Sequence, residues 1–270
     1  MVQNGSDAPI WRLRQPRANL ALWVGWLLAV ALIVWCWTIL TERTIWAFVY
    51  DAPRQAVDIG GRMIPPRISY LPELLMPLWD TINMATLGTL GGVAIATPVA
   101  FLAARNTTPS ATFIRPVALF VIVASRSINS LIWALLLVSI VGPGLLAGMI
   151  AIALRSIGFI GKLLYEAIEE TDRAQIESVE ATGASGAQVL NYGIWPQVAP
   201  AFWAISVFRW DINIRESTVL GLVGAGGIGL QLQNSLNTLA WAQVTMILLL
   251  ILGTVVISEA VSARVRQAII

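Results

Sequence analysis

Histidine is absent from this sequence, and lysine and cysteine each occur only once. The lack of histidine excludes histidine-based catalytic triads, histidine proton relays and most zinc sites. A single cysteine, Cys36, excludes a disulfide within the chain, and its apolar neighbours favour a packing role over pairing or reactivity. No basic patch interleaved with aromatic residues occurs, so nucleic acid is not an expected partner.

Charge is scarce as well. Only 12% of the residues are charged, whereas soluble domains carry about 25%. Hydrophobic residues make up 57% of the chain, and the mean hydropathy is +0.75. A chain of this composition has too little polar surface to cover itself in water. We therefore expect one compact domain embedded in a lipid bilayer.

No motif in the sequence predicts a nucleotide-binding site. The sequence lacks G-x-x-x-x-G-K-[ST], so the chain cannot supply a Walker-type ATP site. Gly224, Gly226 and Gly229 have the spacing G-x-G-x-x-G, but they follow an apolar helix and no βαβ pattern surrounds them. We interpret them as a glycine-rich bend near the outer face. No metal-ligand cluster or nucleophile–base pair occurs, so no catalytic residue, metal or cofactor is expected in this chain.

Six apolar stretches are long enough to cross about 30 Å of hydrocarbon as helices. None alternates in the manner of a barrel strand, and only helices or closed barrels satisfy the backbone in lipid. The first stretch is longer than the core of a signal peptide, which predicts an uncleaved helix. The predicted fold class is an all-α polytopic membrane protein with six transmembrane helices, at about residues 20–40, 78–104, 115–141, 144–168, 197–223 and 237–261.

Arginine positions predict the orientation of these helices. Arginines precede the first span, flank the loop between the second and third spans and follow the last span. The positive-inside rule then puts both termini in the cytoplasm. The four prolines of the polar segment that follows the first span argue against a long helix, although a short surface helix is compatible. The predicted division is a cytoplasmic segment 1–19, an N-terminal helix 20–40, an extracytoplasmic connection 41–76 and a core 77–270.

A polar interruption at about residues 165–196 lies in the cytoplasm in this topology. Its sequence is compatible with a helix up to Thr182, a break at Gly183 and a second helix from Ser185 to Pro196. Two rigid pieces joined at a defined bend would make a lever along the membrane surface. An ordinary amphipathic connecting loop explains the same spacing.

Glu177, Gly183 and Pro196 form the pattern E-x5-G-x12-P. This pattern resembles the cytoplasmic coupling motif of binding-protein-dependent ABC transporter permeases, which docks into a cleft on a separate ATPase subunit. The chain departs from the motif at several positions: Ser178 and Val179 replace two alanines, Ile194 is displaced by one position, and Trp195 replaces a leucine.

Longer strings resemble the phosphonate branch of this permease family. They are ATGAS at 181–185, YGIWPQVAP at 192–200 and FRWDINIRESTVLGLVGAGGIG at 208–229, and the similarity extends over roughly residues 80–268. The resemblance implies a five-helix ABC importer type I core preceded by one extra helix. It also implies a coupling loop at about residues 169–196, with ATPase-coupling residues Glu177, Ala181, Gly183, Ala184, Ser185 and Pro196.

The same resemblance implies partners and a substrate class. The chain would pair with a second copy of itself, with two ATP-binding cassette subunits that bind ATP and Mg, and with an extracytoplasmic substrate-binding protein. Its location would be the bacterial inner membrane. The substrate would be a phosphorus oxyanion, and phosphonate, phosphite and phosphate stay open.

Polar and charged residues within the predicted spans form a second candidate site. Ionisable groups inside a bilayer are costly, so they usually face a cavity or pair with one another. Asp211 and Arg215 lie one helical turn apart, so local pairing that only locks the helix is one interpretation. The other is a substrate pathway in which arginines offer transient stations to an anion. Arg155 is expected to pack or snorkel. The predicted pathway residues are Arg126, Asn129, Arg209, Asp211, Asn213 and Arg215.

Two further patterns bear on assembly and on alternative functions. Gly88 and Gly92 form G-x-x-x-G, which favours a close helix contact within the chain over a dimer seam. A secondary transporter of a small anion is the alternative function. It would need no ATPase and would be expected to contain internal repeats, of which the sequence shows none.

Overall fold

Helices account for nearly all of residues 16–269, the part of the chain that the computed structural model describes, and no strand occurs there. This agrees with the predicted all-α fold class. The chain forms two compact units that divide between Asp58 and Ile59. Most of the predicted N-terminal cytoplasmic segment, residues 1–15, lies outside the described residues.

The first unit contains α1, Pro16–Arg43, and most of α2, Trp46–Met63. Helix α1 includes the first predicted span and is long and apolar enough to cross a membrane. Helix α2 corrects the expectation that prolines would keep this segment short, because it runs for 18 residues with Pro53 inside it. Proline removes one backbone hydrogen bond, and the other turns of α2 stay intact. Its polar and apolar side chains segregate on opposite faces, as in helices that lie along a membrane surface.

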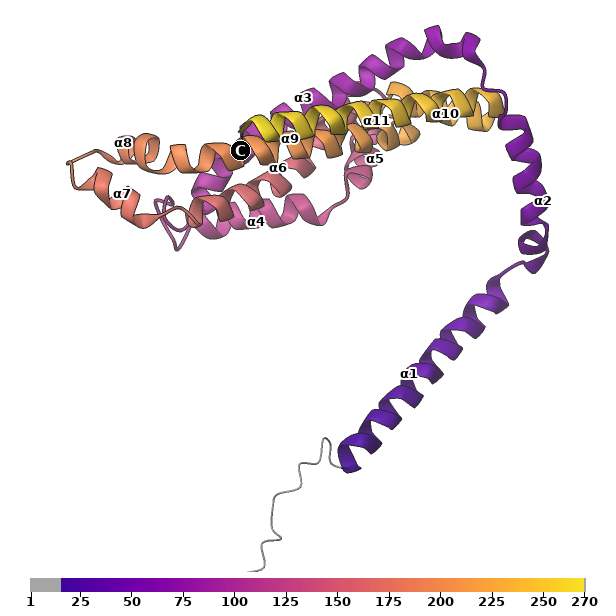
Figure 1. Cartoon of the computed structure of the whole chain (residues 1–270), viewed down its shortest axis with the longest axis horizontal. Coiled ribbons are helices and arrows are strands. Elements are labelled where there is room, and N and C mark those ends of the chain that lie inside the picture. Colours follow the sequence, from indigo (N-terminus) through magenta and orange to yellow (C-terminus); the bar gives the residue numbers. More distant parts are fainter. Residues whose placement is uncertain (1–15, 270) are drawn as a thin grey trace, which may run out of the picture. The chain divides into compact units, whose positions relative to one another are not determined.

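The second unit is a helical bundle. In Figure 1 the long helices α3, α6, α9 and α11 run alongside one another, and the shorter helices α4 and α5 pack against α6. A short 3-10 helix, Ile68–Tyr70, leads into α3. The bundle helices are α3 (Leu71–Ala103), α4 (Ile114–Ser127), α5 (Ser130–Val141), α6 (Leu145–Glu169), α9 (Trp195–Leu220) and α11 (Trp241–Ile269).

Helices α3 and α6 make the most extensive contact in the bundle. A Cβ atom at Gly92 would lie 2.5 Å from the Cβ atom of Ser156, and one at Gly88 would lie 2.8 Å from Cγ2 of Ile152. Glycine is needed at both positions because α6 passes directly over them. The G-x-x-x-G pattern therefore serves a contact within the chain, as predicted.

The third predicted span is not a single straight helix. Helices α4 and α5 meet at a bend of 89°, so the apolar run at 115–141 is broken instead of forming one continuous helix. Asn129 has an extended backbone, and its side-chain Oδ1 accepts a hydrogen bond from the backbone N–H of Leu131 at 3.2 Å. This N-cap begins a new helix inside an apolar run, and an average of hydropathy over the run does not detect it.

Within the described residues, four helices are long and apolar enough to span a membrane: α1, α3 with its 3-10 lead-in, α6 and α11. The bent pair α4–α5 makes a fifth if it is counted as one span. Helix α9 is not among these helices, and its sequence contains four charged residues. It nevertheless packs in the same bundle against α3, α6 and α11. Its charges are accommodated by partners inside the bundle, as described below.

A glycine-rich bend follows α9. A 3-10 turn, Gly221–Val223, leads to Gly224, whose φ of 91° is a left-handed conformation that glycine adopts without strain. The chain then enters α10, Gly227–Asn237, at the opposite end of the bundle from α7 and α8 (Figure 1). The G-x-G-x-x-G spacing is thus a bend between helices, as predicted.

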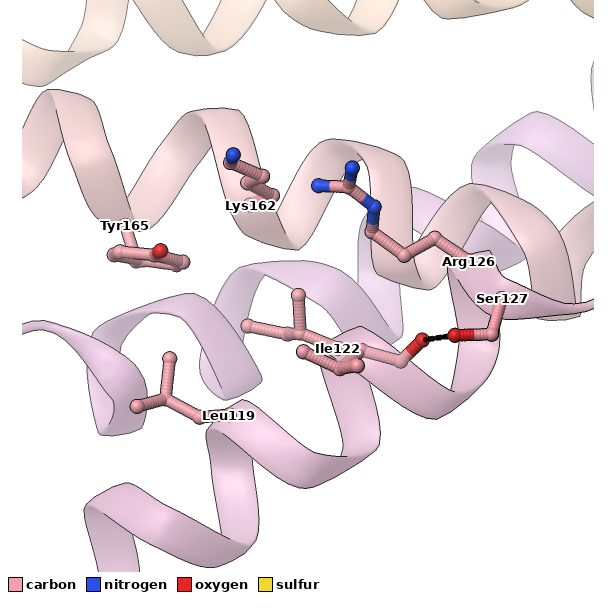
Figure 2. Close-up of a pocket in the computed structure, with 7 residues that line it drawn as sticks. Leu119, Ile122, Arg126, Ser127, Lys162 and Tyr165 are labelled. Carbon is pink, nitrogen blue, oxygen red and sulfur yellow. Dashed lines mark hydrogen bonds between the residues drawn. The ribbon is translucent and has the colours of Figure 1, made fainter. Parts of the chain in front are cut away.

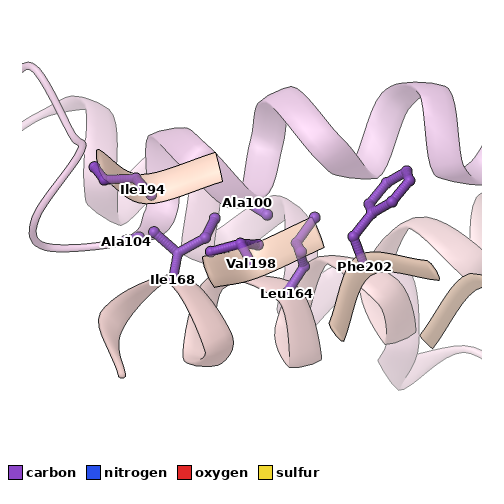
Figure 3. Packing of buried hydrophobic residues seen from close by; sticks show 7 residues of the cluster. All are labelled: Ala100, Ala104, Leu164, Ile168, Ile194, Val198 and Phe202. Carbon is purple, nitrogen blue, oxygen red and sulfur yellow. The ribbon is translucent and has the colours of Figure 1, made fainter. Parts of the chain in front are cut away.

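A buried apolar cluster lies at the end of the bundle from which α7 and α8 extend. Its side chains, drawn in Figure 3, come from α3, α6 and α9, from Ala104 after α3, and from the segment that precedes α9. Each of these side chains is at most 9% exposed. The cluster joins the ends of α3, α6 and α9 into one base. Its members are Ala100, Ala104, Leu164, Ile168, Ile194, Val198 and Phe202.

Candidate functional site: a coupling elbow and a charged bundle core

An elbow projects from the base of the bundle between α6 and α9 (Figure 1). Its first arm is α7, Arg173–Glu180, which Asp172 caps by accepting a hydrogen bond from the backbone N–H of Ala174 at 2.9 Å. The chain turns at Gly183, where φ is 81°. The second arm comprises α8, Gly186–Gln188, and a π-helical stretch, Val189–Ile194, that leads directly into α9.

The predicted break at Gly183 is confirmed, because the left-handed φ there ends the first arm. A continuous helix up to Thr182 is not observed. The polypeptide leaves the helical conformation a first time between Glu169 and Arg173, where Asp172 starts α7. The helical conformation is therefore interrupted at both ends of the first arm.

Hydrogen bonds tie the base of the elbow to the connection between α3 and α4. The Asn106 side-chain amide donates to the carbonyl oxygen of Ile168 at 2.6 Å and to the hydroxyl of Thr171 at 3.1 Å. The Arg115 guanidinium lies 3.4 Å from the Glu169 carboxylate. These contacts join the root of the elbow to the ends of α3 and α4.

The predicted coupling residues fall in two places. Glu177, Ala181, Gly183 and Ser185 are exposed on the elbow, and Ala184 is half-buried beside them. Pro196 lies away from the turn, in the first turn of α9, where a missing backbone N–H costs little.

The inner side of the elbow faces a cavity of about 410 Å³. It is lined by Asn106 and Thr107 from the α3–α4 connection and by Glu180, Ala184 and Leu190 from the elbow. The elbow therefore presents exposed polar side chains outward and leaves a recess behind them.

A buried ion pair occupies the middle of α9. Arg209 is only 1% exposed, and its guanidinium lies 3.3 Å from the carboxylate of Glu216, two turns further along the same helix. Its Nε donates to the Ser156 hydroxyl at 3.1 Å, and the guanidinium lies 5.1 Å from the centre of the Phe159 ring. These partners on α6 satisfy a cation that would otherwise be costly in the bundle core.

Arg155 extends this ion pair to the bend between α4 and α5. Its guanidinium lies 3.6 Å from the Glu216 carboxylate and donates to Asn129 Oδ1 at 3.0 Å and to the Ser130 hydroxyl at 3.3 Å. The expectation was that Arg155 would snorkel or pack at an interface, and these contacts place it at the interface of α6 with α5 and α9. Its partners are on other helices, and no local pattern signals them.

Asn213 completes the polar contacts between α3, α6 and α9. Its amide donates to the Thr89 hydroxyl at 2.7 Å and to the Ser156 hydroxyl at 3.0 Å, and the side chain is fully buried. Ser156 therefore accepts from both Arg209 and Asn213. Arg209 and Asn213 are four residues apart, which predicts that they share one face of the helix, and their shared partner agrees with that placement.

Asp211 and Arg215 form the local ion pair that their spacing predicts. Asp211 is buried, and its carboxylate also accepts a hydrogen bond from the Ser258 hydroxyl of α11 at 2.7 Å. The Arg215 side chain is 47% exposed. This pair joins α9 to α11.

Arg126 stands apart from both ion pairs. It is exposed at the end of α4 and lines a separate cavity with Lys162 and Tyr165 of α6 (Figure 2). The predicted pathway residues therefore occupy three locations: the core centred on Arg209, the α9–α11 contact at Asp211, and this cavity.

The family comparison decides what kind of protein carries this arrangement. Residues 96–269 match the family described as the binding-protein-dependent transport system inner membrane component. The chain belongs to this family. As a family member it is a membrane-embedded transport component, and the secondary-transporter alternative is set aside.

Two curated relatives place this permease among its homologues. It is 41% identical over 209 residues to the phosphite transport system permease protein PtxC of Stutzerimonas stutzeri, a match that covers 77% of this chain and 76% of that protein. It is 40% identical over 220 residues to the phosphate-import permease protein PhnE of Mycolicibacterium smegmatis. That match covers 82% of this chain and 41% of the longer relative.

Solved structures show that the permease has the fold of ABC importer membrane subunits. A chain of the inward-facing MetNI methionine ABC transporter superposes with a TM-score of 0.66 at 20% identity, covering 76% of this chain and 99% of that one. An amino acid ABC transporter gives a TM-score of 0.64 at 19% identity. The predicted type I importer core is therefore confirmed.

Proposed function

We propose that this permease forms the membrane pathway of an ATP-driven importer for a phosphorus oxyanion. The observation that carries the proposal is the 41% identity to a phosphite transport permease over most of both chains. The relative named as a phosphate-import permease is almost as similar. Phosphite, phosphonate and phosphate are tetrahedral anions with the same oxygen chemistry, so one pathway is compatible with all three.

The elbow is the proposed docking site for a separate ATPase subunit, which binds ATP and Mg. The exposed side chains of Glu177, Ala181 and Ser185 face outward, and Gly183 fixes the angle between the arms. The hydrogen bonds of Asn106 and the apolar cluster of Figure 3 support this role, because they join the elbow to three bundle helices. Closure of an ATPase pair on ATP would move two elbows together and reorient the pathway.

This mechanism requires two copies of the permease, two ATPase subunits and an extracytoplasmic binding protein. The elbow then lies in the cytoplasm, and so do both termini. The exposed cations Arg126 and Arg215 are the proposed contacts for the anion. Buried Arg209, Asp211 and Asn213 set the relative positions of α6, α9 and α11 around the pathway.

Transport by the reconstituted complex tests the proposal. The permease, its ATPase and its binding protein would be placed in proteoliposomes, and uptake of phosphite, methylphosphonate and phosphate would be measured with sulfate as the control anion. We expect uptake of at least one phosphorus oxyanion that requires ATP and is lost when the ATPase carries an inactive Walker lysine. Uptake without ATPase would contradict the coupling mechanism, and uptake of none of the three would contradict the substrate.

Native mass spectrometry tests the assembly independently. Two permease chains with two ATPase chains are expected. Loss of the ATPase from the complex on Gly183→Pro, with the permease pair retained, would locate the docking at the elbow. Unchanged binding of the ATPase in that variant would contradict docking at Gly183.

A further inference from the structure

The cavity between α4 and α6 is a candidate anion site that contains Arg126, one of the proposed contacts for the anion. The cavity has a volume of about 450 Å³, and its polar lining consists of Arg126, Ser127, Lys162 and Tyr165. Figure 2 shows the Arg126 and Lys162 side chains ending beside each other over α6, with Tyr165 one turn further along. Lys162 is the only lysine of the chain.

A glycine on α6 brings these two cations together. A Cβ atom at Gly158 would lie 2.6 Å from the carbonyl oxygen of Ile122 and 2.7 Å from the backbone nitrogen of Arg126. The backbone N–H of Gly158 also donates to the Ser125 hydroxyl at 2.9 Å. The end of α4 therefore rests directly on α6, and Lys162 lies one turn beyond Gly158 on the same face. The spacing of the two cations is set by backbone packing.

The charges around the cavity do not balance. Within residues 16–269, the Arg126 side chain has no hydrogen bond or ion pair. The ammonium group of Lys162 lies 3.4 Å from the Glu166 carboxylate. Of the two cations, only Lys162 is thus paired with a carboxylate of the described residues, and Glu166 does not line the cavity. By contrast, Arg155, Arg209 and Arg215 each contact an acidic side chain.

We propose that Arg126, Ser127, Lys162 and Tyr165 bind a phosphoryl oxyanion. A planar guanidinium can hold two oxygens, and the ammonium, the hydroxyl and the phenol can donate to the others. For the case in which the bound anion is the transported substrate, this inference rests on the proposed function. The phosphate group of an anionic lipid has the same chemistry and is the second possible source. Lys162 lies about 10 Å from the elbow-side end of α6, within reach of either.

This site differs from the core that contains Arg209. Arg209 is buried and already satisfied by Glu216 and Ser156, so an anion would have to displace those partners. Arg126 is exposed and faces a cavity with room for a tetrahedral anion and water. The cavity is on the elbow side of the bundle, where an imported anion would leave the pathway.

The single lysine makes a direct experiment possible. The complex with its ATPase would be placed in nanodiscs of phosphatidylcholine in phosphate-free buffer, and reductive methylation of Lys162 would be followed by peptide mass spectrometry. An anion present at ten times its Kd should slow methylation about tenfold. Phosphite and phosphate would be compared with sulfate and chloride. A parallel set of nanodiscs containing phosphatidylglycerol would test the lipid as the source.

Arg126→Gln removes one cation from an exposed position, and loss of a charge-assisted hydrogen bond should weaken binding at least about tenfold. At the same concentration, the anion would then slow methylation of Lys162 only about twofold. Arg126→Lys should keep more protection than Arg126→Gln. Arg264→Gln removes an exposed arginine near the end of α11 and is the matched control. In this variant the anion should slow methylation of Lys162 as much as it does in the unmodified chain.

Protection by phosphite or phosphate that depends on Arg126 would support a site for the free anion. Protection that depends on Arg126 but appears only with phosphatidylglycerol would support a lipid headgroup at the same site. Absence of protection under every condition, or equal protection in Arg126→Gln, would overturn the inference.

The uptake assay separates this inference from the proposed function. ATP-dependent phosphite uptake with no protection of Lys162 would remove the site and leave the function. Protection of Lys162 by phosphate without uptake of any phosphorus oxyanion would remove the substrate assignment and leave the site.

Discussion

Replacing Glu216 with glutamine tests whether one carboxylate holds the bundle core together. Glu216 lies 3.3 Å from the Arg209 guanidinium and 3.6 Å from that of Arg155. Its side chain is 18% exposed, whereas that of Arg209 is 1% exposed. Glu216→Gln removes the negative charge and leaves both arginines without a carboxylate. Removal of one partner from a buried ion pair costs about 3–5 kcal/mol, because the remaining charge is buried and uncompensated.

Arg155→Gln is the matched control. The Arg155 side chain is 31% exposed, and its loss leaves the contact between Arg209 and Glu216 in place. A partly exposed ion pair contributes about 1 kcal/mol or less, so this variant should be destabilised much less than Glu216→Gln. Glu216→Gln leaves the buried cation Arg209 without a carboxylate, whereas Arg155→Gln removes only one contact of Glu216. The difference between their Tm values therefore measures the cost of an unpaired buried cation.

The assay is thermal unfolding of the purified permease followed by tryptophan fluorescence, at one fixed scan rate because membrane proteins often unfold irreversibly. For a chain of this size about 1 kcal/mol corresponds to about 2–4 °C, so Glu216→Gln should lower the Tm by about 6–20 °C. Arg155→Gln should lower it by about 2–4 °C or less.

The double variant Arg209→Met with Glu216→Gln gives a second measurement. It removes the buried cation together with its carboxylate, so it should recover most of the stability lost in Glu216→Gln. Equal Tm losses for Glu216→Gln and Arg155→Gln, or a double variant less stable than Glu216→Gln, would refute the reasoning.

Two further predictions concern glycines. Gly92→Ala should lower the Tm by several degrees, since overpacking costs about 1–3 kcal/mol and its Cβ atom would meet Ser156, whereas Gly91→Ala makes only an ordinary contact at 3.7 Å. Equal Tm values for these two variants would contradict the close approach of α3 and α6. Gly183→Val should reduce the stimulation of ATPase activity by loaded binding protein, because a β-branched residue is strained at a φ of 81°. Gly183→Asn should keep most of that stimulation, and equal loss in both variants would argue against a role for the turn conformation.

Local sequence chemistry predicted much of this fold. Apolar length identified the helices, Gly183 marked the turn of the elbow, and Gly224 marked the bend after α9. Each prediction depends on the conformational preferences or hydropathy of a short segment, which the sequence contains in full. The pairing of Asp211 with Arg215 was predictable for the same reason, because one helical turn separates them.

Hydropathy was less informative where a short polar signal interrupts a long apolar run. Asn129 begins α5, and the third span bends by 89° there, although the polar stretch at 125–130 is short compared with the apolar run that contains it. Pro53 misled in the opposite direction, since α2 continues through it. In both cases the tendency of one residue to interrupt a helix opposes the tendency of its neighbours to continue it. Which tendency prevails depends on the packing of the whole segment.

The sequence by itself determined that this is a helical membrane protein with an elbow, because hydropathy and helix breaking are properties of short segments. Only the tertiary structure decided which charges meet. Arg155 contacts Glu216 from another helix, and Arg126 faces Lys162 because Gly158 lets α4 rest on α6. Charged groups on different helices interact according to the angle and distance at which the helices pack, and residues far apart in the chain set that geometry jointly.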